Sequence, residues 1–539
     1  MNADILIRNG SVFDSVSDEP YGGYVAISGN RIMETGQGDG AALAGPNTKV
    51  IDAKGGTVMA GFHDSHTHLL MAGMYTAYPN LSDCRSEEEA VARMVAAAET
   101  GIFGGEDSWV IGFGWYHVFW DNKQLPSHES LDAAFPDRPV MLLNAEAHGV
   151  WVNSKAMRIA GIDENTPDPK GGEILRRPDG RPSGILSEGA SGLVTKYACD
   201  FDAEREKELI GRFMAGAAAN GITSICDVMP YFHGNMGHIP VYSQMDRSGS
   251  LTVRIHAAPD LLGDLDEVVE WQRAYSSEKL KVAHVKQFLD GVSTTHTALM
   301  LEPYADDPQS RGIAMFPLSD IRRAVPEAHR RGLSVKLHSC GDASARFALD
   351  CYEEAINNYG KNDCRHAIEH CEYIDGEDIP RFGELGAVPS VQPEHLALTQ
   401  SYAENPYRET MGEKRAGRCW RYRSLLRSSG HIAIGSDCPV VNNNPFLEIY
   451  RGISRVHDDG EPAGGWNPEE KLTLAEVLRG YTLGSAWAAL REGELGSIES
   501  GKLADIIIID RDLFASEPRE IKKASVSVTI FDGRVVYEK

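Results

Sequence analysis

Short apolar runs alternate with helix-like stretches through the middle of this chain, and this alternation constrains the fold more than any other feature. Strands that alternate with helices form parallel sheets, and eight such units can close into a barrel. The apolar runs span 57–66, 222–228, 252–258, 281–288, 333–338, 366–371, 387–391 and 431–436. Helical patterns at 203–219, 319–331, 343–357 and 473–490 separate several of them. We therefore expect an α/β fold in which residues 56–494 form a TIM-like (β/α)8 barrel.

The two ends of the chain are rich in strand patterns and poor in helical ones. Short β-type runs occur near both termini, separated by Gly, Asn and Asp turn signals. They lie at 4–8, 24–28, 48–52, 504–510, 525–530 and 534–538. This pattern predicts a composite β-sandwich made of residues 1–55 and 495–539, with two unrelated caps on the barrel as the alternative.

The interval from 70 to 220 is too long for one strand-to-strand crossover. It contains strand-like runs of its own at 108–113 and 139–144. We interpret residues 70–220 as a lobe inserted after the first barrel strand. Loops at that face of a barrel normally build the active site, so we expect the lobe to cover it.

Composition narrows the partners that this chain can have. The 539 residues carry a formal net charge of −25, which argues against binding to nucleic acid or to an anionic membrane surface. No apolar run approaches the ~20 residues needed to span a bilayer, and the N-terminus has no signal-peptide pattern. Nine cysteines without framework spacing indicate reduced thiols. These features predict a cytoplasmic protein without a membrane partner.

Six side chains able to bind a metal fall at the ends of predicted barrel strands. Parallel strands of a barrel all open on one face, so donors at their ends can converge on a single cation. The six are His66, His68, Lys286, His338, His370 and Asp437. Their convergence would place a metal site at the mouth of the barrel.

The first two candidates form an HxH pair. His66 and His68 are two residues apart, so both side chains point to one face of a strand. Asp64 shares that face and could orient a ligand histidine, whereas His63 has the opposite parity and is not expected to bind metal. A lone HxH is common by chance, so a structural role is the alternative.

The next three candidates each have a simpler explanation. A lysine among apolar neighbours is costly to bury, so Lys286 would either pair with Asp290 or react with carbon dioxide to give an anionic carbamate ligand. A single buried histidine such as His338 or His370 is commonly a satisfied core residue. Two of them at successive strand ends, downstream of an HxH pair, favour metal binding.

Asp437 follows the run HIAIGS and precedes a loop. A carboxylate at the last strand end can bind metal and also accept the proton of a bound water. The alternative is a turn or helix N-cap aspartate.

The order of these residues along the chain resembles the amidohydrolase superfamily of metal-dependent hydrolases. Further stretches are similar to amidohydrolase family 3, which includes N-substituted formamide deformylases. They are 131–162 (LDAAFPDRPVMLLNAEAHGVWVNSKAMRIAGI), FLDGV after Lys286, 337–344 (LHSCGDAS), 365–372 (RHAIEHCE), 435–440 (GSDCPV) and 496–510 (GSIESGKLADIIIID). The resemblance covers essentially the whole chain.

The resemblance implies a ligand arrangement and a reaction. His66, His68 and Asp437 would hold an inner metal and His338 and His370 an outer one, with carboxylated Lys286 between them. One or two divalent cations are implied; zinc is the expected metal, although nitrogen and oxygen ligands also suit manganese, iron or nickel. Asp437 would act as the catalytic acid and base in hydrolysis by activated water. Two local departures, NAEAHG before WVNS and Cys438, affect no implied ligand.

The inserted lobe carries further candidates. His148 could donate a hydrogen bond to a developing oxyanion, beside Asn153 as a substrate-binding residue, or it could be structural. Trp115 and Trp120 belong to an aromatic cluster that either lines a substrate pocket or fills a core. Pocket walls of this kind would favour an apolar or aromatic substrate group.

We expect an enzyme that hydrolyses a non-peptide C–N bond in a small molecule, such as an N-substituted formamide. The alternatives are a lactonase, a phosphoesterase or a deaminase with the same metals, or a non-catalytic scaffold homologue. Family resemblance also suggests a homodimer.

Overall fold

A computed structural model describes residues 2–105, 107–145, 147–169, 171–230, 234–397, 399 and 401–539. The chain divides into two compact units. Unit 1 comprises residues 1–68, 214–228 and 242–539, and unit 2 comprises residues 69–213 and 229–241. All six candidate metal ligands belong to unit 1, whereas His148, Asn153, Trp115 and Trp120 belong to unit 2.

Unit 1 contains two sheets of parallel strands. Their strands are buried on both faces, as expected when helices cover a parallel sheet. The four-stranded sheet has the order β14 (Leu280–Val282), β13 (Arg254–Ala258), β12 (Ile222–Val228), β6 (Phe62–Thr67). The five-stranded sheet has the order β15 (His284–Phe288), β16 (Ser334–Ser339), β17 (Ala367–His370), β18 (Val388–Val391), β19 (Ala433–Ile434). Isolated parallel bridges, Thr67 with Cys438 and Asp260 with Lys286, connect the two sheets.

These strands occupy the eight predicted runs, with two corrections. The run 57–66 is not one strand: it divides at Gly61 into β5 (Thr57–Ala60) and β6, which belong to different sheets. Gly61 passes so close to Thr223 that a Cβ would lie 2.2 Å from its hydroxyl oxygen, which favours glycine at this position. The run 281–288 likewise divides into β14 and β15.

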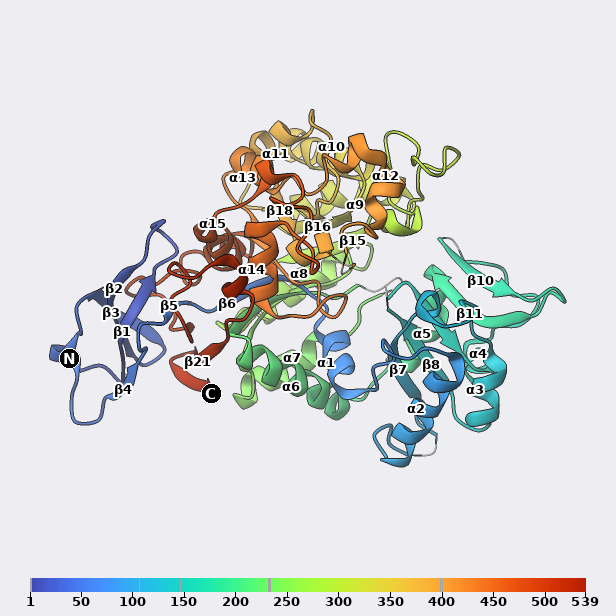
Figure 1. Cartoon of the computed structure of the whole chain (residues 1–539), viewed down its shortest axis with the longest axis horizontal. Coiled ribbons are helices and arrows are strands. Elements are labelled where there is room, and N and C mark those ends of the chain that lie inside the picture. Colours follow the sequence, from blue (N-terminus) through green and yellow to red (C-terminus); the bar gives the residue numbers. More distant parts are fainter. Residues whose placement is uncertain are drawn as a thin grey trace. The chain divides into compact units, whose positions relative to one another are not determined.

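Helices of unit 1 pack on the parallel strands. In α10 (Asp342–Tyr359), Ala345, Leu349 and Tyr352 are buried at helical spacing, and the Tyr352 hydroxyl donates to the carbonyl of Ala367 in β17 at 2.7 Å. Figure 1 shows α11 (Ile379–Leu385) between α10 and α13 (Tyr422–Ser429) along these strands. The other helices lying wholly in this unit are α8 (Leu265–Ala274), α9 (Leu318–Arg330), α11 (Ile379–Leu385), α12 (Pro406–Ala416), α13 (Tyr422–Ser429), α14 (Pro445–Ser454), α15 (Leu474–Arg479), α16 (Ser485–Ala488) and α17 (Pro518–Ile521).

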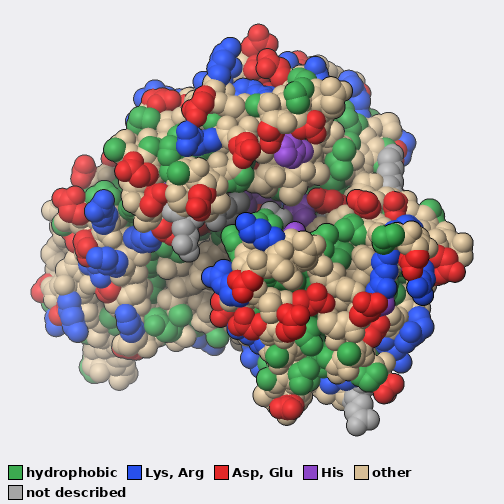
Figure 2. All heavy atoms as spheres, turned by 45° about the vertical axis from the view of Figure 1, so that its right-hand side comes forward, with side chains coloured by type: hydrophobic (Ala, Val, Ile, Leu, Met, Phe, Trp, Pro, Cys, Tyr) green, Lys and Arg blue, Asp and Glu red, His purple; other side chains and the backbone are tan. Residues whose placement is uncertain are grey.

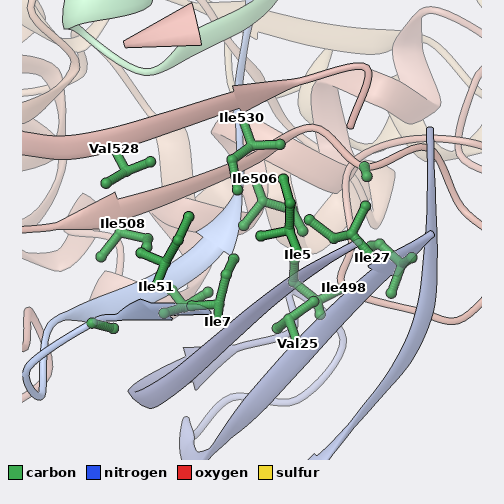
Figure 3. Packing of buried hydrophobic residues seen from close by; sticks show 14 of the residues in the cluster. Ile5, Ile7, Val25, Ile27, Ile51, Ile498, Ile506, Ile508, Val528 and Ile530 are labelled. Atoms are coloured by element: carbon green, nitrogen blue, oxygen red, sulfur yellow. The ribbon is translucent and has the colours of Figure 1, made fainter. Parts of the chain in front are cut away.

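Both chain ends contribute to one eight-stranded sheet. Its order is β22 (Arg534–Glu538), β21 (Val526–Phe531), β20 (Ile506–Ile509), β5, β1 (Ile5–Phe13), β2 (Tyr21–Ser28), β3 (Arg31–Gln37), with β4 (Lys49–Asp52) also paired to β1. Figure 3 shows the shared core, in which Ile5 and Ile27 from the first strands lie close to Ile506 and Ile530 from the last. Apolar burial therefore joins the two termini.

Unit 2 has its own five-stranded sheet and helices. The strand order is β10 (Gly172–Arg176), β11 (Pro182–Glu188), β9 (Gly149–Val152), β8 (Val140–Asn144), β7 (Val110–Trp115). Its helices are α1 (Leu69–Ala77), α2 (Glu87–Glu99), α3 (His128–Ala134), α4 (Ser154–Ala160) and α5 (Gly192–Ala198). Helices α6 (Ala203–Ala219) and α7 (Ile239–Ser248) each contribute residues to both units.

The surface is charged without a large region of one sign on the face in view. Acidic and basic side chains are interspersed there (Figure 2). Within the described residues, every helix is too short or too polar to cross a lipid bilayer.

Candidate metal centre

The carboxyl end of β6 lies against the segment that follows β19. Backbone hydrogen bonds fix the two, from Asp437 N to the His66 carbonyl at 2.7 Å and from His68 N to the Cys438 carbonyl at 2.9 Å. Asp437 Oδ1 consequently lies 3.3 Å from His66 Nε2 and 3.4 Å from His68 Nε2. The HxH pair and the last candidate carboxylate thus meet at one point.

Two candidate ligands have unusual backbone conformations. His370 has φ of 74° and Asp437 has φ of 60°, both in the left-handed region that side-chain-bearing residues seldom adopt. Such conformations cost on the order of 1 kcal/mol or more and cluster at functional sites. His370 is the last residue of β17 and Asp437 lies just beyond the end of β19, so both conformations occur where the chain leaves a strand.

Glu369 determines which nitrogen of the neutral His66 ring carries the proton. Its Oε2 lies 2.6 Å from His66 Nδ1, and its Oε1 accepts a hydrogen bond from Lys336 Nζ at 2.9 Å. Although burial opposes the charged form, Lys336 and His66 lower the pKa of Glu369. The ionised carboxylate needs a proton on Nδ1, which leaves the lone pair of His66 on Nε2. Burial also lowers the pKa of the His66 ring to about 4, so the ring stays neutral.

His66 Nε2 and Asp437 Oδ1 therefore face one another as two electron-pair donors. Although burial favours the neutral acid, the neighbouring His68 lowers the pKa of Asp437, so its carboxylate is ionised. Neither atom has a hydrogen-bond partner among the described residues, and the same holds for both ring nitrogens of His370 and for Lys286 Nζ. A buried polar group left without a partner costs roughly 1–3 kcal/mol. A divalent cation would satisfy the electron-pair donors of this set together, so the residues fit a metal.

His338 lies on the neighbouring strand within reach of the same site. Its ring centroid is 4.3 Å from that of His370. His338 Nε2 lies 3.2 Å from the carbonyl of Gly291 and, as a donor to that oxygen, would leave the electron pair of the ring on Nδ1. The imidazole can then serve as a ligand through Nδ1.

Lys286 is fully buried in the middle of β15. Burial lowers the pKa of its amine to about 8, so a neutral, nucleophilic fraction exists near neutral pH. Its Nζ lies 4.5 Å from the ring centroid of Phe288, whose ring is 4.9 Å from that of His338. The alternative pairing with Asp290 is wrong, because that carboxylate instead accepts hydrogen bonds from Leu299, Cys340, Gly341 and Ser344.

Two functional positions were missed or misassigned from the sequence. Asp64 does not orient a histidine ring; it accepts hydrogen bonds from the backbone N of His66 and from Ser436. Glu369 takes the expected role of Asp64. The signal for Glu369 was a carboxylate inside a short apolar strand, where an ionised group needs partners.

In unit 2, His148 and Asn153 both contact groups of their own unit. His148 Nδ1 lies 2.7 Å from Glu188 Oε2. Asn153 caps α4 by accepting from Ala156 N, and its amide also donates to the carbonyl of Phe135. These contacts give Asn153 a clear structural role.

The two tryptophans of the aromatic cluster are also interior. Trp115 is 2% exposed and Trp120 is 1% exposed, and their rings lie 6.1 Å apart beside Trp151. Trp115 donates from its indole nitrogen to the carbonyl of Leu142 at 2.8 Å. The packing favours the core alternative over a substrate-binding role.

A second group of ligand-type side chains, formed by His329, Cys364 and His366, does not fit a metal. Val335 N donates to His366 Nδ1, which places the proton of that ring on Nε2, 2.9 Å from His329 Nδ1. His329 Nε2 in turn lies 2.9 Å from the carbonyl of Gly360. The hydrogen-bond chain occupies the nitrogens that a metal would need.

Comparison with known proteins gives consistent matches over the chain. A model of the amidohydrolase family matches residues 49–537. Protein LONG AFTER FAR-RED 3 of Arabidopsis thaliana is 30% identical over 99% of this chain and 92% of its own length. The N-substituted formamide deformylase of Arthrobacter pascens is 27% identical over 99% of this chain and 98% of its own length. The crystal structure of an uncharacterized metal-dependent hydrolase from Pyrococcus horikoshii OT3 shares the fold, with a TM-score of 0.78 at 23% identity, covering 96% of this chain and 99% of that one.

Proposed function

Since this chain belongs to the amidohydrolase family and is a hydrolase acting on non-peptide carbon–nitrogen bonds, we propose that it cleaves a small N-acyl compound, with an N-substituted formamide as the first candidate. The family expected from the sequence is thereby confirmed. The choice of formamide is supported by the deformylase relative, which is matched along nearly its whole length. Of the alternatives, a deaminase would cleave another carbon–nitrogen bond with the same activated water, whereas a lactonase or phosphoesterase would cleave an ester bond and is not favoured by these relatives.

One observation carries the proposal: buried electron-pair donors face each other at 3.3 Å, between His66 Nε2 and Asp437 Oδ1, without a hydrogen-bond partner for either atom among the described residues. We propose that His66, His68 and Asp437 hold an inner cation, that His338 and His370 hold an outer one, and that carboxylated Lys286 lies between them. Zinc is the proposed metal. The bridges between the two parallel sheets support a closed (β/α)8 barrel around this site.

When bound, a divalent cation supplies a water whose pKa is lowered toward ~7 and polarises a substrate carbonyl. Proton transfer and the orientation of the ligand ring are assigned to side chains of this protein. Asp437 accepts the proton of the attacking water and delivers it to the leaving nitrogen, for which its lowered pKa in the resting site keeps it ionised and ready. Glu369 holds the His66 ring in the tautomer that presents Nε2 to the site.

Further sequence-based assignments are also proposed. We retain a composite β-sandwich of residues 1–55 and 495–539, supported by the sheet that both ends share, and residues 70–220 as an inserted lobe. An oxyanion-stabilising role for His148 and a homodimer are also retained as proposals.

The substrate proposal is tested with purified protein loaded with zinc. We expect hydrolysis of N-substituted formamides, measured as formate release, to exceed that of matched acetamides, lactones, phosphate esters and aminopurines. Asp437→Asn should keep the fold, measured by circular dichroism, and lower kcat by at least 100-fold. Faster turnover of any other substrate class would replace the formamide proposal.

A further inference from the structure

A third imidazole lies against the second oxygen of Asp437. His395 follows β18 in the short helix η5 (Pro393–Ala397) and is buried. Its Nε2 lies 3.6 Å from Asp437 Oδ2, and its Nδ1 lies 3.9 Å from Glu372 Oε1. The ring is thus placed between two carboxylates, one of them the proposed proton carrier.

Glu372, on the other side of the His395 ring, is held by two hydrogen bonds. The Tyr407 hydroxyl donates to Glu372 Oε2 at 3.0 Å, and Trp420 N donates to the backbone carbonyl of Glu372 at 2.7 Å. Tyr407 lies at the start of α12 and is itself 1% exposed. Glu372 is therefore fixed through both its side chain and its backbone, and its Oε1 lies 3.9 Å from His395 Nδ1.

The two oxygens of Asp437 face different groups. Oδ1 faces His66 and His68, whereas Oδ2 faces His395. His395 Nε2 makes no hydrogen bond to the described residues, so the carboxylate is the polar group at which this buried nitrogen is aimed. A carboxylate contacted on one oxygen alone can rotate about its side-chain bonds, and a contact on the second oxygen restricts that rotation.

We propose that His395, held by Glu372 and Tyr407, is a positioning residue for Asp437. It keeps Oδ2 turned toward η5 and so directs Oδ1 toward the cation and the attacking water. This inference rests on the proposed metal-dependent hydrolysis, and it adds residues from η5 and α12 to the proposed site. Groups that orient a metal ligand from behind typically contribute 10–100-fold to metal affinity or activity.

Two variants of His395 test the role. His395→Ala removes the contact with Asp437, whereas His395→Gln keeps an N–H donor of similar reach. The zinc affinity of the full-length, metal-stripped protein is measured by competition with a chelator, together with zinc stoichiometry, kcat and KM. We expect His395→Ala to lose about 10–100-fold in zinc affinity and in kcat, with KM changed less than about threefold and the stoichiometry intact. His395→Gln should recover most of both losses.

Several results would overturn the proposal. Unchanged or tighter zinc binding by His395→Ala would remove His395 from this role, and loss of a whole zinc equivalent would make it a ligand instead. Equal impairment of both variants would indicate that the ring only fills space. If His395→Ala does not fold, Tyr407→Phe tests the proposal instead and should lower the zinc affinity. Tyr422→Phe is the control, because the buried Tyr422 hydroxyl contacts Gln392, and it should leave the zinc affinity unchanged.

The affinity measurement needs no substrate, so this inference and the proposed function fail separately. A wild-type protein that hydrolyses none of the tested compounds would overturn the function, and the zinc affinities would still decide the role of His395. Active protein whose zinc affinity and kcat are insensitive to His395 would overturn the positioning role alone.

Discussion

Individual side chains at the candidate metal centre fit a cation and are costly to bury without one. Lys286 shows this most clearly, because its amine is fully buried, points to no hydrogen-bond acceptor among the described residues and has a lowered pKa. An ordinary buried lysine would have a carboxylate within reach, and Asp290 is already occupied by other donors. A carbamate formed on the amine would replace this unpaired buried group by an anionic metal ligand.

Replacing Lys286 by Ala should therefore remove bound metal and activity together. We expect the zinc content, measured by elemental analysis, to fall to less than half of the wild-type value and kcat to fall by at least 100-fold. Added short carboxylates should partly restore both, because they can occupy the space of the carbamate. Lys281→Ala, at a half-buried lysine of the preceding strand, is the control and should retain metal. Full activity of Lys286→Ala would exclude Lys286 from the site.

A buried histidine away from the proposed ligands makes the stability of the protein depend on pH. Burial, with Arg491 and Lys336, lowers the pKa of His63 to about 3, whereas an unfolded histidine titrates near 6.5. Between these values the unfolded state binds the extra proton, so stability falls as the pH falls below about 6.5.

Replacing His63 should make the unfolding free energy depend less on pH. Between pH 7 and pH 5, metal-free wild-type protein should lose about 2 kcal/mol more unfolding free energy than His63→Leu. Urea unfolding at the two pH values measures the difference. Identical slopes for wild type and His63→Leu would contradict the assignment.

At the scale of secondary-structure elements, the ends of strands decide where the site forms. The predicted runs and the observed strands agree, since apolar composition and turn residues mark both. Their division at Gly61 and between β14 and β15 could not be predicted, because it depends on which neighbouring strand each half pairs with. The same holds for Glu369, whose partners His66 and Lys336 come from other strands.

The close approach of β19 to β6 at Gly435 gives an element-scale prediction. A Cβ there would lie 2.4 Å from His66 N and 2.8 Å from Asp64 Oδ1, so Gly435→Ala must push the two strand ends apart. We expect a loss of about 1–3 kcal/mol in stability and weaker zinc binding, measured by thermal melting and chelator competition. Gly216→Ala in α6, where nothing lies within 4 Å, should be neutral or stabilising by up to about 1 kcal/mol. Equal behaviour of the two variants would contradict a tight strand contact.

At the scale of the whole molecule, the chain ends are held together by a shared sheet. Strands β20 and β21 come from the last part of the chain and pair, through β5, with strands from the first part. Ile506 and Ile530 are fully buried between them. The first and last strands therefore share one sheet and one apolar core.

Truncation of one side chain in this core should lower the stability of unit 1 as a whole. Ile506→Ala should cost about 2–5 kcal/mol of unfolding free energy, because it leaves a cavity in a packed apolar cluster. Val535→Ala, at a half-buried position of the edge strand β22, should cost much less. Thermal melting of the two variants and of wild type gives the comparison. A melting point for Ile506→Ala within a degree of wild type would mean that the shared sheet contributes little.

The sequence by itself determined the positions of the strands and the set of candidate ligands, because apolar periodicity and residue chemistry are local properties that need no knowledge of neighbours. Only the tertiary structure decided which groups meet: Glu369 with His66, His395 with Asp437, and Asp290 with donors other than Lys286. The first two contacts join residues 303 and 42 positions apart, and such pairings follow from how strands and loops pack in space rather than from any pattern along the chain.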